Sequence, residues 1–249
     1  AKSFGFKIEP MNINTSGTSW TALPDGKTLV QPLTSIKGLG EKAVEQIMNN
    51  RPFQTIDDFL FDENVVYSKL NKKAIDVLVR SQALNCLMDE RFSGLKHYWS
   101  AVALDRPRTL KKFLENVKLY EPEGDFTEEE KIEFLTDLTG VFPIRMVADE
   151  KLLKKFEEKY IPPLGEYDPD LGVSWFIPRH VEVKKTKKGK DYWIVDVIDI
   201  TSKITKIKCW GIRKEDKIFI NRPYMARLDY DEQWGFSTRS VRKNFRLVG

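Results

Sequence analysis

The sequence predicts an α+β protein of several domains, in which a helical region precedes a small β-barrel. Two observations predict this order. Apolar residues recur with the helical period from Leu33 to about residue 159. Beyond residue 172, apolar and polar residues alternate as they do in strands. The intervening stretch, residues 161–172 (IPPLGEYDPDLG), is rich in Pro, Gly and Asp and is interpreted as a linker.

The first 32 residues consist of short extended pieces around the turns NTSGTSW and LPDGK. Helices are then expected at residues 41–50, 55–61, 71–80, 89–104, 107–118, 127–139 and 148–159. Thr55 can cap the second of these helices, and Pro107 suits the first turn of the fifth. Thr127 followed by Glu130 is a capping box for the sixth.

Five strands are expected after the linker. They are SWFIPRHVEVKK, DYWIVDVID, KITKIKCW, PYMARLDYD and WGFSTRSVRKNFRLV. The first two are joined by TKKGK, whose Gly189 suits a hairpin turn. Five strands with a short break, GIRKED, after the third predict a closed barrel of the OB type.

The composition is that of a globular protein with real cores. The chain has 249 residues, of which 41% are hydrophobic and 31% charged, enough for two or more domains. Its apolar runs fall short of the roughly 18 residues that a membrane span needs, and its start, AKSFGFKIEP, lacks the apolar region of a signal peptide. Its two cysteines and two histidines have no metal-type spacing. We therefore expect a protein of the reducing cell interior without a zinc site.

The net charge of +4 conceals a segregation of charge along the chain. Residues 89–170 carry 13 basic and 19 acidic side chains, whereas residues 171–249 carry 18 basic and 9 acidic ones. The last segment is a concentrated positive module, for which a polyanion is the first partner to consider. The acidic segment is interpreted as a solvated brace that avoids such a partner.

The stretch SIKGLGEKAVEQI, residues 35–47, places two glycines immediately before a helix. Gly38 and Gly40 can adopt backbone angles closed to other residues. The amides at the helix start lack partners and lie at the positive end of the helix dipole. With Lys37 and Lys42 beside them, they suit a nucleic-acid phosphate that is bound without reading a base.

A glycine pair alone is weak evidence, and its plain interpretation is a tight turn without a ligand. Two features favour the phosphate site. The apolar spacing from Leu33 to Ile47 is similar to the helix-hairpin-helix motif, and residues 68–84 (SKLNKKAIDVLVRSQAL) look like a second, degenerate copy. The predicted backbone-binding residues are Lys37, Gly38, Leu39, Gly40, Lys42, Lys72 and Lys73.

At this point the sequence resembles a known family. The segment DGKTLVQPLTSIKGLGEKAVEQIMNNRPFQTIDDFL, followed by LNKKAIDVLVRSQAL, is similar to the part just after the fingers in bacterial C-family replicative DNA polymerases, the DNA polymerase III alpha subunits. There a short strand pair leads into tandem helix-hairpin-helix units with an RPF helix between them. Residues 125–142 and 181–199 resemble the family's helix before an OB domain and the first hairpin of that domain.

The resemblance implies four parts. They are the end of the fingers at residues 1–32, tandem helix-hairpin-helix units at 33–88, a helical connector at 89–165 and an OB domain at 172–249. It implies that the chain binds and positions DNA, both duplex and single-stranded template, beside an upstream polymerase core in the same polypeptide or a separate one. It also implies a cytoplasmic location, in a bacterium or a phage-infected bacterium.

The chain departs from the family's pattern in three respects. The family's catalytic aspartates and their Mg²⁺ lie in a palm domain that would precede residue 1, so we expect the C-terminal part of a larger or split polymerase, without a cofactor of its own. The second hairpin ends in SQAL, residues 81–84, where AGAF is usual. Residues 88–165 contain no glutamine, and QALNCL at 82–87 is a poor clamp-binding peptide, which puts binding of a sliding clamp in doubt.

OB barrels bind single strands across their second and third strands, with aromatics for stacking and cations for the backbone. Alternation along KITKIKCW puts Ile207 and Cys209 inside and the flanking lysines and Trp210 outside. Tyr192 or Trp193, whichever points outward, would share that face, although burial is favoured for Trp193. The predicted single-strand-binding residues are Lys184, Lys185, Lys187, Lys188, Lys190, Tyr192, Lys206, Lys208 and Trp210.

Burial is expected for Trp175 and Phe176, because large aromatics dominate protein cores. For Trp210, at the end of a strand, burial in the barrel and exposure for stacking are equally favoured.

Nothing in the sequence indicates catalysis by this chain. Asp57 and Asp58 are adjacent on a helix and point about 100° apart, so they do not form a metal pair, and their position at a helix start explains their charge. The first hypothesis is therefore a DNA-binding and positioning portion of a polymerase. The alternative is a replisome scaffold that binds proteins and touches DNA incidentally.

Overall fold

Short strands and turns precede the first helix in the computed structural model, which describes residues 7–121 and 124–248. Strands β1 (Lys7–Glu9), β2 (Thr21–Ala22) and β3 (Thr28–Val30) form a small sheet in the order β1-β3-β2. Strand β1 is parallel to β3, and β2 is antiparallel to it. Val30 and the following Leu33 are buried and lead the chain into the helical core.

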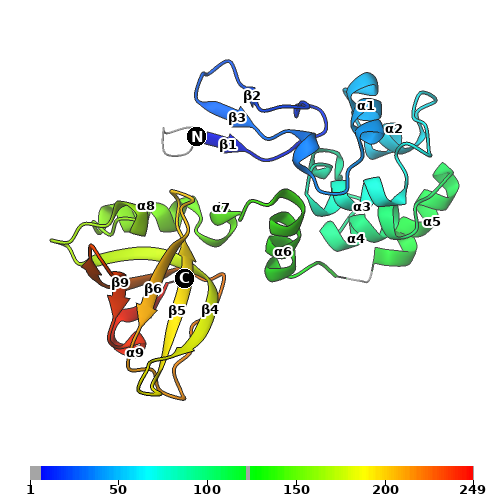
Figure 1. Ribbon diagram of the computed structural model, residues 1–249. Helices are drawn as coiled ribbons and strands as arrows, with labels where there is room; N and C mark the ends of the chain where they lie inside the picture. Colours follow the sequence, from blue (N-terminus) through cyan, green and yellow to red (C-terminus); the bar gives the residue numbers. More distant parts are fainter. Residues whose placement is uncertain (1–6, 122–123, 249) are drawn as a thin grey trace. The chain divides into compact units, whose positions relative to one another are not determined.

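The helices of the first unit, which extends to Pro143, pack around one core (Figure 1). They are α1 (Glu41–Asn50), α2 (Ile56–Phe61), α3 (Lys72–Arg80), α4 (Leu95–Trp99), a π-helical turn (Ser100–Leu104), α5 (Leu110–Tyr120) and α6 (Glu128–Thr139). Their apolar residues have the spacing that puts one face of each helix inward. In α3 this face comprises Ala74, Ile75, Leu78 and Val79, as the sequence predicts.

Two helix boundaries differ from the prediction. The helix expected at 89–104 begins only at Leu95, because the Asp89 carboxylate accepts a hydrogen bond from the Arg91 amide (3.0 Å) and holds this segment in a turn. The helix expected at 107–118 begins at Leu110, where the Thr109 hydroxyl accepts from the Lys112 amide (3.2 Å). Pro107 therefore precedes the helix. The cap at Thr55 and the capping box at Thr127 are confirmed, and the structure shows that Thr55 also forms a capping box, with Asp58.

The second unit, from Ile144 onward, contains α7 (Ile144–Val147), α8 (Glu150–Glu158) and a curled sheet. Its strands are β4 (Val173–Lys185), β5 (Asp191–Ile198), β6 (Thr205–Cys209), β7 (Tyr224–Arg227), β8 (Asp229–Asp231), β9 (Gly235–Thr238) and β10 (Phe245–Leu247). The fold class, α+β with a helical region followed by a barrel-like domain, is confirmed.

The sheet curls because its long first strand, β4, pairs with different neighbours along its two halves. Strand β4 pairs with β7 through Val173–Phe176 and with β5 through residues 177–185, and its bulge falls at Pro178, which cannot donate to a ladder. Strands β7 and β8 are the halves of one strand interrupted at Leu228, and β8 pairs with β9. Strand β9 runs parallel to β6. The strands thus form a curled, barrel-like sheet, with β10 added at β7.

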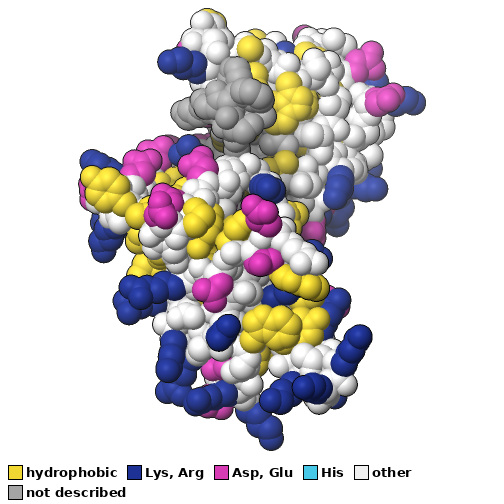
Figure 2. Space-filling view, turned by 60° about the vertical axis from the view of Figure 1, so that its left-hand side comes forward, with side chains coloured by type: hydrophobic (Ala, Val, Ile, Leu, Met, Phe, Trp, Pro, Cys, Tyr) yellow, Lys and Arg dark blue, Asp and Glu magenta, His cyan; other side chains and the backbone are white. Residues whose placement is uncertain are grey.

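The last predicted strand was too long. The stretch WGFSTRSVRKNFRLV contains β9, the short helix α9 (Val241–Asn244) and β10. Val241 is buried in the barrel core, so the chain turns inward where continuous alternation was expected. Lys and Arg side chains crowd the surface of this domain around a hydrophobic patch (lower part of Figure 2).

Residues 161–172 pack against the barrel and are not a free linker. Leu164 is buried in the barrel core, the Tyr167 hydroxyl donates to the Leu228 carbonyl (2.7 Å), and the Gly165 amide donates to Asp199 (2.6 Å). Helix α8 packs on the same domain, where Phe156 stacks on Trp175 with ring centroids 5.1 Å apart. Trp175 and Phe176 are buried, as expected.

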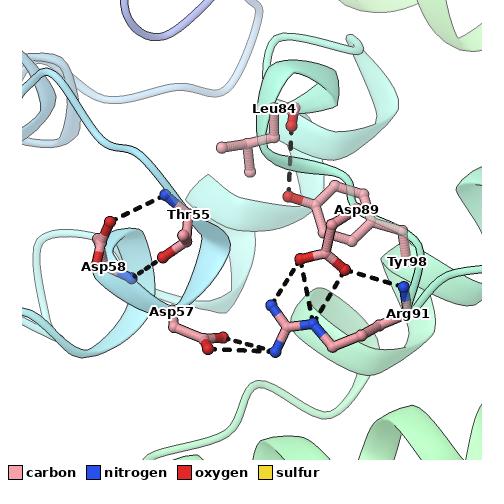
Figure 3. A network of polar contacts seen from close by, with 7 residues as sticks. All are labelled: Thr55, Asp57, Asp58, Leu84, Asp89, Arg91 and Tyr98. Atoms are coloured by element: carbon pink, nitrogen blue, oxygen red, sulfur yellow. Dashed lines mark hydrogen bonds and ion pairs between the residues drawn. The ribbon is translucent and has the colours of Figure 1, made fainter.

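A network of charged groups ties α2 to the loop before α4 (Figure 3). Arg91 forms ion pairs with Asp57 (3.1 Å) and Asp89 (2.7 Å). Asp58 takes no part in it, because its carboxylate accepts from the Thr55 amide in the capping box. The hydrogen bond from the Arg91 guanidinium holds the pKa of Asp89 below its usual value, against the opposing effect of partial burial.

We predict that Arg91→Met lowers the free energy of unfolding by about 1 kcal/mol at pH 7, a modest loss because water screens both carboxylates. A depressed folded pKa stabilises the protein above the unfolded pKa of about 4, and this contribution disappears as the pH falls through the folded value. The difference between wild type and variant should therefore shrink towards zero by about pH 2. Urea denaturation across this pH range measures it.

The matched control is Arg145→Met, because Arg145 pairs with Glu150 at an exposed position. Its free energy of unfolding should stay within about 0.5 kcal/mol of wild type at every pH. A gap for the Arg91 variant that persisted at low pH would contradict the electrostatic explanation.

Candidate nucleic-acid interface

The Gly-Leu-Gly turn has the backbone that its glycines predict, but only one of them requires glycine. Gly38 is left-handed, with φ +87°, whereas Gly40 is extended, with φ −74°, and is the N-cap of α1. Leu39 is partly buried against the core, and Ala43, Val44 and Ile47 bury the inner face of α1. Leu39 therefore holds the turn to the core, while Gly38 and Gly40 are exposed to solvent.

Several amides of this turn lack an acceptor. Within residues 7–121 and 124–248, no hydrogen bond is formed by the amides of Gly38, Gly40, Glu41 or Lys42, and no side chain caps α1. The first amides of a helix carry partial positive charge and bind anions readily. Glu41 stands in the first turn and opposes an anion, so the flanking cations Lys37 and Lys42, both exposed, must supply the net attraction.

The second turn lies directly beside the first. A Cβ built on Gly38 would meet Lys73 Cε at 3.5 Å and Val77 at 3.6 Å, so the first turn rests on the N-terminal half of α3. Helix α3 is capped by Asn71, whose side chain accepts from the Ala74 amide (3.0 Å). Lys72 and Lys73 follow this cap and are exposed. The structure thus brings together the two predicted turns.

On the barrel, the strand alternation is as predicted. Ile207 and Cys209 are fully buried, while Lys206 is exposed and Lys208 partly so. Tyr192 is the aromatic that faces outward, since it stacks on Trp210 with centroids 4.5 Å apart and ring planes 21° apart. Its neighbour Trp193 packs against the barrel core. Trp210 is therefore half-buried by Tyr192. This lies between the two outcomes that the sequence left open, burial in the barrel and exposure for stacking.

An exposed tryptophan that sequence reasoning missed joins this face. Trp234, in the turn between β8 and β9, is 64% exposed, and Lys208 Nζ lies 5.2 Å from its ring centroid. The same ammonium donates to the Trp234 carbonyl (3.1 Å). The signal in the sequence is a tryptophan inside the turn DEQWG, where no core position requires a large aromatic.

Five further lysines lie in and beside the hairpin that joins β4 to β5. Lys184 and Lys185 end β4 and Lys190 precedes β5, with Lys187, Lys188 and Gly189 (φ +75°) in the turn between them. All five lysines are exposed. Lys184 lies 3.3 Å from Glu182, and Lys206 lies 3.8 Å from Asp196, so part of the positive charge of this domain is compensated locally.

The described residues contain no group of three or more His, Cys, Asp or Glu side chains that could hold a metal ion. Asp57 pairs with Arg91 and Asp58 caps α2, which gives each a structural role. Among the helices of the described chain, none is both long enough and apolar enough to cross a membrane.

Comparisons with known proteins agree with these features. A family model described as "Helix-hairpin-helix motif" matches residues 5–93. The chain is 27% identical over 230 residues to DNA polymerase III subunit alpha of Aquifex aeolicus, covering 88% of this chain and 19% of that protein. It is 35% identical over 104 residues to the same subunit of Pseudomonas aeruginosa (40% and 9% covered), and 36% identical over 112 residues to the error-prone DNA polymerase of Corynebacterium efficiens (44% and 10%). The chain spans about a fifth or less of the length of these relatives.

The backbone angles of the turn predict different responses of its two glycines to substitution. Gly38→Ala should lower the free energy of unfolding by about 1 kcal/mol, because an L-residue is strained at positive φ. Gly40→Ser should not lower it, because this N-cap is extended, has open space around its Cβ position, and gains a hydroxyl that can cap α1. Urea denaturation measures both variants, and equal losses would contradict the assigned backbone.

Proposed function

Because the chain is a relative of the bacterial C-family DNA polymerases, as its motifs predict, we propose that it is the DNA-binding and DNA-positioning portion of such an enzyme. In this proposal the hairpins hold the backbone of duplex DNA and the barrel contacts the single-stranded template. Catalysis belongs to a palm domain, in the same polypeptide or a separate one, which also binds the Mg²⁺ of the reaction. This chain contributes affinity and orientation.

The adjacency of the two hairpin turns is the observation that carries the proposal. The contact of Gly38 with Lys73 and Val77 joins the start of α1 and the start of α3 into one surface. The start of α1 contributes unpaired amides, and both helix starts contribute lysines. Such a surface can hold neighbouring phosphates of one strand without reading bases. Binding of this kind is independent of sequence and strongly dependent on salt, because each neutralised phosphate releases counterions.

The barrel face supports the second half of the proposal. Strands β5 and β6 correspond to the second and third strands of an OB barrel, and the hairpin and the β8–β9 turn border them. The Tyr192–Trp210 pair and Trp234 supply ring surfaces for stacking, and Lys206 and Lys208 lie between them on β6.

A specific observation favours the scaffold alternative. Helix α5 leaves Leu110 and Leu114 exposed over a shallow groove that Lys111, Glu115 and Lys118 also line. An exposed apolar helix face is typical of a site that binds protein. Under this alternative, DNA binding by the chain would be weak and would not depend on the hairpin lysines.

Titration of fluorescent duplex and single-stranded DNA by anisotropy, at several salt concentrations, tests the hairpins. Lys37→Gln with Lys42→Gln should weaken duplex binding and make the plot of log K against log salt shallower by about 1.8, for two lost phosphate contacts. The charge-matched control, Lys151→Gln with Lys154→Gln on α8, should leave the slope unchanged. If wild-type protein binds duplex with no salt dependence, the scaffold alternative takes the place of this proposal.

The same titration tests the barrel. Trp210→Ala should weaken single-strand binding about 5- to 150-fold, the effect of losing one stacked base at roughly 1–3 kcal/mol, and should leave duplex binding unchanged. Tyr160→Ala removes an exposed aromatic that lies at the end of α8 and should affect neither. Equal effects of the two substitutions would contradict a stacking role for Trp210.

A further inference from the structure

A buried arginine of the first unit has no acceptor. Arg106, between the π-helical turn and α5, is only 7% exposed. Its Nε, Nη1 and Nη2 atoms are all buried without a hydrogen-bond partner in the described part of the chain. Leaving a buried guanidinium unpaired is strongly destabilising, which is why charged groups in protein interiors normally meet an acceptor.

A tyrosine ring covers this guanidinium. The Tyr67 ring centroid lies 3.7 Å from Arg106 Cζ and 4.7 Å from Arg108 Cζ. The ring face of Tyr67 therefore lies over Arg106, where cation–π attraction stabilises the desolvated guanidinium. The neighbouring carboxylate, Asp105, is paired with Lys112 at 2.9 Å. The guanidinium groups of Arg106 and Arg108 thus both contact the Tyr67 ring, while the Asp105 carboxylate is paired with Lys112.

The cover is partly exposed to solvent. Tyr67 is 37% exposed and Arg108 is exposed, so a ligand can reach Arg108 directly and Arg106 once the ring turns aside. Guanidinium forks match the oxygens of phosphate and carboxylate. Tyr67 belongs to the turn that leads into α3, five residues before Lys72, and α3 packs along the π-helical turn that precedes Arg106. The same hairpin therefore carries Tyr67 and the predicted phosphate-binding lysines.

We propose that Arg106 and Arg108 form a further anion site that binds one phosphodiester of duplex DNA, with Tyr67 as its movable cover. The proposal rests on the DNA-binding function proposed above and extends the grip of the second hairpin by one phosphate. A carboxylate of a protein partner has the same shape, but nothing else around Arg106 favours it over the nucleic acid held by the neighbouring turn.

The test compares duplex binding of the intact chain and its variants by anisotropy. Arg106→Gln with Arg108→Gln should weaken binding about tenfold, as expected for the loss of charged hydrogen bonds, and make the salt slope shallower by about one. Lys27→Gln with Lys118→Gln removes the same charge from exposed positions of the first unit and should change neither. Because Arg106→Gln can disturb folding, Arg108→Gln alone is measured too, and unchanged binding by that variant would overturn the proposal.

Duplexes carrying one neutral methylphosphonate at successive positions locate the contact. Wild-type protein should lose affinity at one particular phosphate, and the double arginine variant should be insensitive to that substitution. If Lys37→Gln with Lys42→Gln weakens binding but the arginine variants do not, this site fails while the hairpin function stands. If wild-type protein binds no duplex, or does so without salt dependence, both fail.

Discussion

The left-handed backbone at Gly38 is the constraint on which the proposed DNA-binding surface depends. It turns the chain sharply enough for the loop before α1 to rest on Lys73 and Val77 of α3. Leu39 below the turn and the buried face of α3 hold the two elements to one core. Two helix starts that are about 30 residues apart in sequence are thereby brought into contact.

The two arginine clusters of the first unit show what pairing does for a partly buried charge. Arg91 lies between two carboxylates, which satisfy its guanidinium and fix α2 to the loop before α4. Arg106 is more deeply buried and has only an aromatic ring beside it. A satisfied cation of the first kind stabilises the fold. An unsatisfied one costs stability, and the proposed phosphate ligand would supply the missing acceptor.

The barrel separates its apolar and functional side chains by strand alternation alone. Ile207 and Cys209 fill the interior, and the residues between and after them face solvent. On that outer face the aromatics are held by one another and by a cation, Tyr192 by Trp210 and Trp234 by Lys208. In the proposed single-strand binding, rings supported in this way would lose less entropy when a base stacks on them.

The sequence by itself determined the order of helical region and barrel, the positions of α1 to α3, the Thr55 cap, the Thr127 capping box and the inward face of β6, because local periodicity and capping chemistry depend only on near neighbours in the chain. Tertiary structure decided the rest. It packed residues 161–172 onto the barrel, divided the last expected strand with α9 and chose Tyr192 over Trp193 as the outward ring. It also placed Gly38 on α3, Trp234 beside Lys208 and Tyr67 over Arg106. Each of these depends on contacts between residues far apart in sequence, which no local pattern encodes.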